Sequence, residues 1–126
     1  MWRYEPDEHP KRRHHWEHDY AGFVQVGAKM VGKCPNNLTN EEAEALLTEG
    51  IPYYPARWRQ DDPQRIYAVK DGVIYRAMPT NPGRSYHGFP ELPDRFRELP
   101  AKLKRKVMER AEPLGCWNEV SKWLKG

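Results

Sequence analysis

The stretch RIYAVKDGVIYRAM, residues 65–78, places Asp71-Gly72 between two β-prone runs. An Asp-Gly pair favours a two-residue type I′ turn, because both central positions of that turn need positive φ. Such a turn sets the register of the whole hairpin. The stretch therefore predicts an antiparallel hairpin with four defined cross-strand pairs: Lys70 with Val73, Ala68 with Tyr75, Tyr67 with Arg76, and Ile66 with Ala77.

The two faces of this predicted hairpin differ in chemistry. Alternation of side chains along a strand places one set of residues on each face. The face expected to pack against the core carries Ile66, Ala68, Val73, Tyr75 and Ala77. The other face mixes apolar, basic and aromatic residues: Arg65, Tyr67, Val69, Ile74, Arg76 and Met78.

Upstream, the pattern predicts a second hairpin and a helix. Residues 23–31 read FVQVGAKMV, and their central glycine suits the first position of a type II′ turn. Thr39 and Glu42 have the spacing of a capping box, which predicts a helix over residues 40–49. We expect Gly50 to end this helix in a left-handed conformation.

Downstream, apolar residues recur every fourth position from residue 99 to residue 111 and predict a helix over residues 100–111. A last amphipathic helix is expected over residues 116–125. Between these elements, residues 51–63 and 79–93 are rich in proline and turn formers and are expected to be loops.

Together these elements predict one α+β domain. Its core is a small antiparallel sheet built from the two β-hairpins, with one helix between them and two C-terminal helices packed on the sheet. With 126 residues, five Trp, seven Tyr and three Phe, the chain has enough bulky apolar surface for a single core. Residues 1–20 are expected to be an irregular N-terminal arm, and residues 21–126 the domain.

Composition excludes several classes of protein. No apolar run approaches the roughly 20 residues of a membrane helix, so no membrane partner is expected. Cys34 and Cys116 are far apart and form no disulfide framework, so we expect two reduced thiols and a cytoplasmic location. The spelling His14-His15-Trp16-Glu17-His18 contains H-x-x-E-H, but without a helix signal it predicts neither a catalytic zinc site nor a cofactor. A solvated histidine cluster, or adventitious metal binding by His9, His14 and His18, is expected instead.

The first functional hypothesis is binding of RNA or another polyanion. The net charge of +3 and pI near 8.9 are only mildly basic, so the hypothesis depends on how arginines and aromatic residues are placed. Bases stack on aromatic rings and arginines meet phosphates in single-strand sites. The candidate binding residues are Arg57, Trp58, Arg59, Arg65, Tyr67 and Arg76.

The second hypothesis is an enzyme, a metal-independent ribonuclease of toxin type. His87 would act as general acid or base, with Arg84 and Tyr86 beside it on a glycine-flanked loop. A structural role of His87 and Tyr86 in packing this loop is the stronger alternative. The third hypothesis is a protein-interaction or immunity-type partner module that binds through exposed aromatic residues. The sequence specifies neither a substrate nor an oligomeric state.

Overall fold

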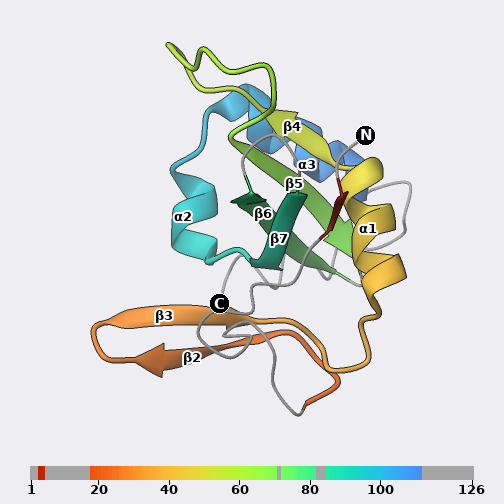
Figure 1. The fold of residues 1–126 in the computed structure, drawn as a ribbon. Helices are drawn as coiled ribbons and strands as arrows, with labels where there is room; N and C mark the ends of the chain where they lie inside the picture. The colour runs from red at the N-terminus through yellow and green to blue at the C-terminus, as the bar shows by residue number, and fades with distance from the viewer. Residues whose placement is uncertain (1–2, 5–17, 71, 82–84, 112–126) are drawn as a thin grey trace.

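The computed structural model of the chain describes residues 3–4, 18–70, 72–81 and 85–111, which adopt an α+β fold (Figure 1). The predicted fold class is therefore confirmed. The elements in chain order are β1 (Arg3–Tyr4), β2 (Gly22–Val26), β3 (Lys29–Lys33), α1 (Asn40–Thr48), β4 (Ile51–Tyr53), β5 (Arg65–Lys70), β6 (Val73–Asn81), β7 (Ser85–Pro90), α2 (Pro93–Arg97) and α3 (Ala101–Ala111).

The main sheet has the strand order β1-β7-β6-β5-β4. Its neighbouring strands are antiparallel except for β1 and β7, which are parallel. The β5–β6 hairpin lies at its centre, and all four predicted cross-strand pairs are present. Gly72 has φ of +80°, as the predicted turn requires of its second position, whereas Asp71 lies outside the described residues.

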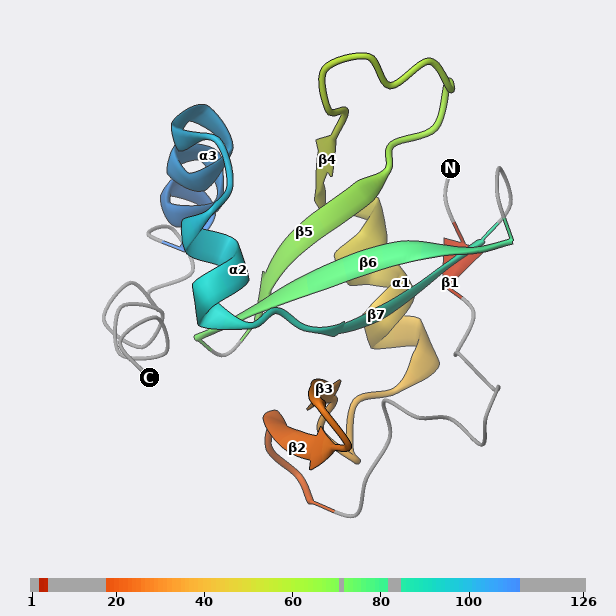
Figure 2. The ribbon, with the colours of Figure 1, turned by 90° about the vertical axis from the view of Figure 1, so that its left-hand side faces the viewer.

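Helices cover both faces of this sheet, so the fold has three layers (Figure 2). On one face, Leu47 of α1 packs with Ile66, Ala77 and Tyr86. On the other face, a larger cluster packs Phe96 of α2, Leu99 before α3 and two residues of α3 against the sheet. Its members are Ile51, Tyr67, Val69, Ile74, Phe96, Leu99, Leu103 and Val107. Burial of each such large side chain contributes roughly 1.5–3 kcal/mol. The predicted packing of a C-terminal helix on the sheet thus occurs through α3.

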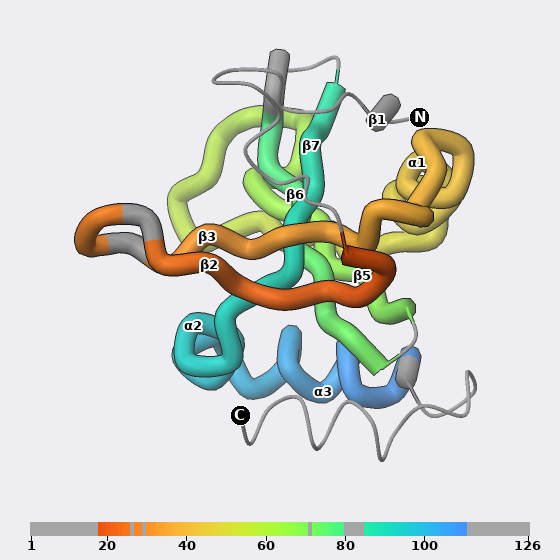
Figure 3. Tube along the Cα trace, turned by 90° about the horizontal axis from the view of Figure 1, so that it is seen from below, coloured from red at the N-terminus to blue at the C-terminus, as the bar shows by residue number. Residues whose placement is uncertain are grey.

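The β2–β3 hairpin forms a separate two-stranded sheet that crosses one end of β7 (Figure 3). The two hairpins were expected to share one sheet, and this detail was wrong. Gly27 has φ of +61° and lies at the predicted turn position, with Val26 paired to Lys29. At Gly32 the hairpin approaches Pro90 so closely that a Cβ atom would lie 2.5 Å from the Pro90 carbonyl oxygen. Glycine at this position therefore permits the docking of the hairpin on the main sheet.

The predicted capping box of α1 is present. The Glu42 amide donates to Thr39 Oγ1 at 3.1 Å, and the Thr39 amide donates to Glu42 Oε1 at 3.1 Å. Gly50 does not have the expected positive φ. It is instead a packing glycine, because a Cβ atom there would collide with the Ile66 side chain.

Helix α3 confirms the predicted helix over residues 100–111 to within one residue. Leu103 and Val107 are buried, while Lys102, Arg105 and Lys106 are exposed. Among the described residues, no helix combines the length and the apolar character needed to cross a membrane.

Several elements lie in segments that were expected to be irregular. Strand β4 falls within residues 51–63, β7 and the start of α2 fall within residues 79–93, and β1 falls within the N-terminal arm. The predicted last helix over residues 116–125 lies outside the described residues.

Candidate anion-binding site

The basic and aromatic face of the β5–β6 hairpin is not the open surface that a passive RNA binder would present. Tyr67 has no exposed surface, and Arg76 is 9% exposed. Antiparallel sheets often leave one face in water, but here α2 and α3 cover this face. Tyr67 therefore has no ring face on which a base could stack.

The arginine-bearing part of this face borders a cavity of about 360 Å³, which we call the arginine cavity. Three arginines from three elements line it: Arg65 of β5, Arg76 of β6 and Arg95 of α2. Arg95 is exposed, Arg65 is half-buried and Arg76 is buried, so the three side chains range from the solvent edge into the protein. The remaining lining residues are Tyr53, Pro55, Gln64, Glu98, Leu99 and Pro100.

Arg76 is held in place by a carboxylate and an aromatic ring. Its Nη1 lies 3.4 Å from Glu91 Oε2, and its Cζ lies 4.9 Å from the centre of the Phe89 ring. Burial lowers the pKa of the Arg76 guanidinium, and the Glu91 charge opposes that shift. Burial raises the pKa of Glu91, and Arg76 opposes that shift in turn. The pair thus carries two charges in a place where neither is well solvated.

Arg65 extends this polar cluster along β5. Its Nη1 donates to Tyr67 Oη at 3.3 Å, whereas burial raises the pKa of the Tyr67 hydroxyl. Three polar atoms of this cluster are buried without a hydrogen-bond partner among the described residues: Nε of Arg65, Nε of Arg76 and Oε2 of Glu91. Buried polar atoms are rarely left without a partner in native proteins, and exceptions call for an explanation.

The loop between β4 and β5 carries the other three candidate binding residues. Arg57 and Arg59 are exposed. Trp58 is half-buried, and its Nε1 donates to the Asp62 carbonyl at 2.8 Å, which anchors the loop. Arg57 has φ of +70°, the only positive φ outside glycine among the described residues. The base of this loop, at Pro55, lines the arginine cavity.

The structure separates the two candidate catalytic residues that it describes. Tyr86 and His87 are neighbours on β7 and so point to opposite faces of the sheet. Tyr86 is buried, and its hydroxyl donates to the Pro63 carbonyl at 2.6 Å. The His87 ring lies 6.0 Å from the Phe89 ring, and Arg84 lies outside the described residues. A packing role accounts for the Tyr86 geometry.

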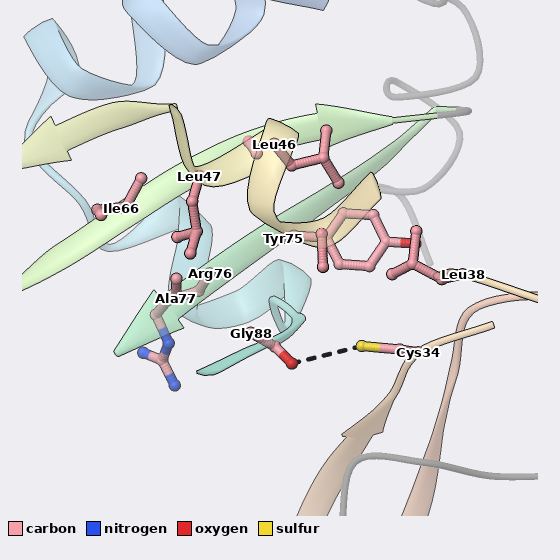
Figure 4. Close-up of a pocket in the computed structure, with 11 residues that line it drawn as sticks. Cys34, Leu38, Leu46, Leu47, Ile66, Tyr75, Arg76, Ala77 and Gly88 are labelled. Carbon is pink, nitrogen blue, oxygen red and sulfur yellow. Dashed lines mark hydrogen bonds between the residues drawn. The ribbon is translucent and has the colours of Figure 1, made fainter. Parts of the chain in front are cut away.

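A second cavity, beneath α1, is apolar and much smaller, at about 30 Å³ (Figure 4). Cys34 lies at its edge, where the thiol donates to the Gly88 carbonyl at 3.4 Å. Burial raises the pKa of this thiol to about 12, and Cys34 forms no disulfide. Figure 4 shows the Arg76 guanidinium pointing away from Leu47 and Ile66, toward the opposite side of the sheet. This space is far smaller than the roughly 300–1,000 Å³ of small-molecule sites.

Exposed apolar residues do not gather on one described surface. Val24 and Met30 are both exposed on the β2–β3 hairpin, but Val24 pairs with Val31 and Met30 with Gln25. The alternation of strand residues therefore places Val24 and Met30 on opposite faces of the hairpin. This arrangement lacks the contiguous apolar patch that marks many protein-interaction sites.

The H-x-x-E-H spelling lies outside the described residues except for His18, whose ring stacks on Tyr20 at 5.0 Å. Within the described ranges, no group of three or more histidine, cysteine, aspartate and glutamate residues is arranged to hold a metal ion.

Sequence reasoning identified Arg65 and Arg76 but missed the other polar residues of the cavity, namely Tyr53, Gln64, Arg95 and Glu98. Arg95 had no local signal, because α2 has only five residues. Tyr53 was visible as an aromatic residue next to Tyr54, but its strand was hidden by the proline between Ile51 and Tyr53.

The sequence matches no known protein-family profile, no curated protein and no solved structure.

Proposed function

We propose that the protein binds single-stranded RNA, with phosphate groups held by the arginine cavity and by the β4–β5 loop. The observation that carries this proposal is the convergence of Arg65, Arg76 and Arg95 on one cavity. Arginine is suited to phosphate because its planar guanidinium offers several donors in a fixed geometry.

The surroundings of the cavity support an extended anionic ligand. Arg57 and Arg59 are exposed on the loop whose base lines the cavity, so they can meet further phosphates along a strand. Tyr53 lines the cavity, and Tyr54 is 49% exposed. Tyr54 replaces the buried Tyr67 as the residue on which a base can stack, a contact worth roughly 1–3 kcal/mol.

Salt-dependent RNA binding tests the proposal. Fluorescence anisotropy with a labelled 12-nucleotide poly-uridine would give the dissociation constant at several salt concentrations. Each phosphate contact contributes a slope of about −0.7 in log affinity against log salt for a single strand. Replacing Arg57 by glycine and Arg59 by alanine together should weaken binding and flatten that slope by about 1.4, because two contacts are lost.

Removal of two exposed lysines of α3, with Lys102→Ala and Lys106→Ala, is the matched control, since it lowers the net charge equally. We expect this control to retain the wild-type slope. Equal weakening in both double variants would mean that binding follows net charge alone. Absence of binding by the wild-type protein at low salt would refute the proposal.

A further inference from the structure

The arginine cavity is small, and its three arginines differ in exposure. Its volume of about 360 Å³ lies near the lower limit of small-molecule sites, roughly 300 Å³. The Arg76 side chain is only 11% exposed, whereas Arg95 is exposed. A ligand that contacts both must therefore pass from the surface into the protein.

The charges around the cavity favour an anion. Three arginines line it, and the two nearby carboxylates belong to Glu98, in its lining, and to Glu91, which is paired with Arg76. One net positive charge therefore remains. The Arg76 guanidinium is held over the Phe89 ring at 4.9 Å, so its orientation is set before any ligand arrives.

The depth of Arg76 discriminates between two kinds of phosphate. An internal phosphodiester carries one negative charge, and its chain continues on both sides, which keeps it at the surface. A terminal phosphomonoester carries between one and a half and two negative charges near neutral pH and is attached on one side only. The low exposure of Arg76 therefore favours a terminal group, which can reach this side chain while the rest of the strand leaves past Arg95.

We propose that the arginine cavity binds the terminal phosphate of single-stranded RNA, through Arg65, Arg76 and Arg95. This inference rests on the proposed function and narrows its ligand from an RNA backbone to an RNA end. Tyr53, which also lines the cavity, is placed to contact the nucleotide next to that phosphate.

The test compares one oligonucleotide in three forms: with a 5′-phosphate, with a 3′-phosphate and with hydroxyl groups at both ends. Each form carries its fluorophore on an internal base. We expect one phosphorylated form to bind wild-type protein at least tenfold more tightly than the hydroxyl form, and the preferred form identifies the end. Equal affinity for all three forms would overturn the end site while leaving the proposed function intact, whereas no binding of any form would overturn both.

Two variants on the same helix locate the effect. Arg95→Ala should reduce the preference for the phosphorylated form to about twofold or less. Arg97→Ala should keep the full preference, because Arg97 pairs with Asp94 and does not line the cavity. Retention of the preference in Arg95→Ala would refute the assignment. Uridine monophosphate serves as a competitor. If it binds as tightly as the phosphorylated oligonucleotide, the cavity is a site for a free nucleotide and the RNA-end proposal is overturned.

Discussion

Arg76 and Glu91 form a buried ion pair, with 3.4 Å between Nη1 and Oε2, in which the glutamate side chain is 1% exposed and the arginine side chain 11%. The Glu91 amide also donates to the Ile74 carbonyl at 2.9 Å, and Glu91 Oε1 accepts from the Leu92 amide at 3.0 Å. Glu91 thus holds the cavity arginine and the start of the segment that leads into α2. The pair links the stability of the fold to the electrostatics of the candidate site.

Replacing Arg76 alone should lower the free energy of unfolding more than removing the charges of both Arg76 and Glu91. Arg76→Met leaves the Glu91 carboxylate buried without its partner, and removing one member of a buried pair destabilises by roughly 3–5 kcal/mol. Adding Glu91→Gln should recover more than half of that loss, because no buried charge then remains. Urea unfolding at neutral pH measures both free energies. Additive losses in the double variant would show that the two side chains are not coupled.

The pH dependence of stability should report the buried carboxyl. Burial raises the pKa of Glu91 above its ordinary value of 4.5. Between 4.5 and the raised pKa, the unfolded chain binds fewer protons at this residue than the folded chain, so the contribution of Glu91 to stability falls as pH rises. The unfolding free energy of wild type minus that of Glu91→Gln should therefore decrease with pH above 4.5, by up to about 1.4 kcal/mol per pH unit. A constant or rising difference would contradict the assigned shift.

Arg57 should be unfavourable for stability at its position. The Trp58 amide donates to the Pro55 carbonyl at 3.0 Å, which closes a β-turn with Arg57 at its third position and φ of +70°. Glycine adopts that conformation without strain, so Arg57→Gly should raise the free energy of unfolding by up to about 1 kcal/mol while weakening RNA binding. Thermal unfolding and anisotropy measured on the same preparation test both effects. A less stable variant with unchanged RNA affinity would contradict this account of the loop.

Short sequence motifs correctly predicted the β5–β6 hairpin and the start of α1. The register of the β5–β6 hairpin and the capping box of α1 follow from two and four residues respectively, and both are present. Strand β4 was missed because Pro52 interrupts it, and β7 because it lies in a segment rich in proline and glycine. Pro52 is tolerated because β4 lies at the sheet edge, and Pro90 because it ends β7.

The cavity could be predicted only in part. Arg65 and Arg76 belong to the hairpin whose register was predicted, but their burial depends on helices that cover a face expected to remain open. Arg95 joins them through long-range packing of α2, for which no short sequence pattern exists. The sequence therefore indicated the chemistry of the site more accurately than its shape.

Two glycines, on the contacting strands β3 and β7, should respond differently to an added methyl group. At Gly32 an added Cβ would lie 2.5 Å from the Pro90 carbonyl oxygen, so Gly32→Ala must displace backbone. At Gly88 the nearest atom is the Arg76 carbonyl oxygen at 3.7 Å, an ordinary contact, and alanine would extend into the apolar space beneath α1. We expect Gly32→Ala to lower the melting temperature by about 4 °C or more and Gly88→Ala to leave it unchanged or raise it. Equal melting temperatures for the two variants would refute the docking of the β2–β3 hairpin on β7.

NMR of the arginine side chains would show whether Arg65, Arg76 and Arg95 face one anion. The Nε–Hε signals would be assigned by mutation and followed while the protein is titrated with end-phosphorylated oligonucleotide. We expect the signals of Arg65, Arg76 and Arg95 to shift together and to saturate at the same concentration, while that of Arg97 stays in place. Saturable shifts that leave Arg65 and Arg76 unchanged would refute the proposed site, because the ligand would then bind outside the cavity.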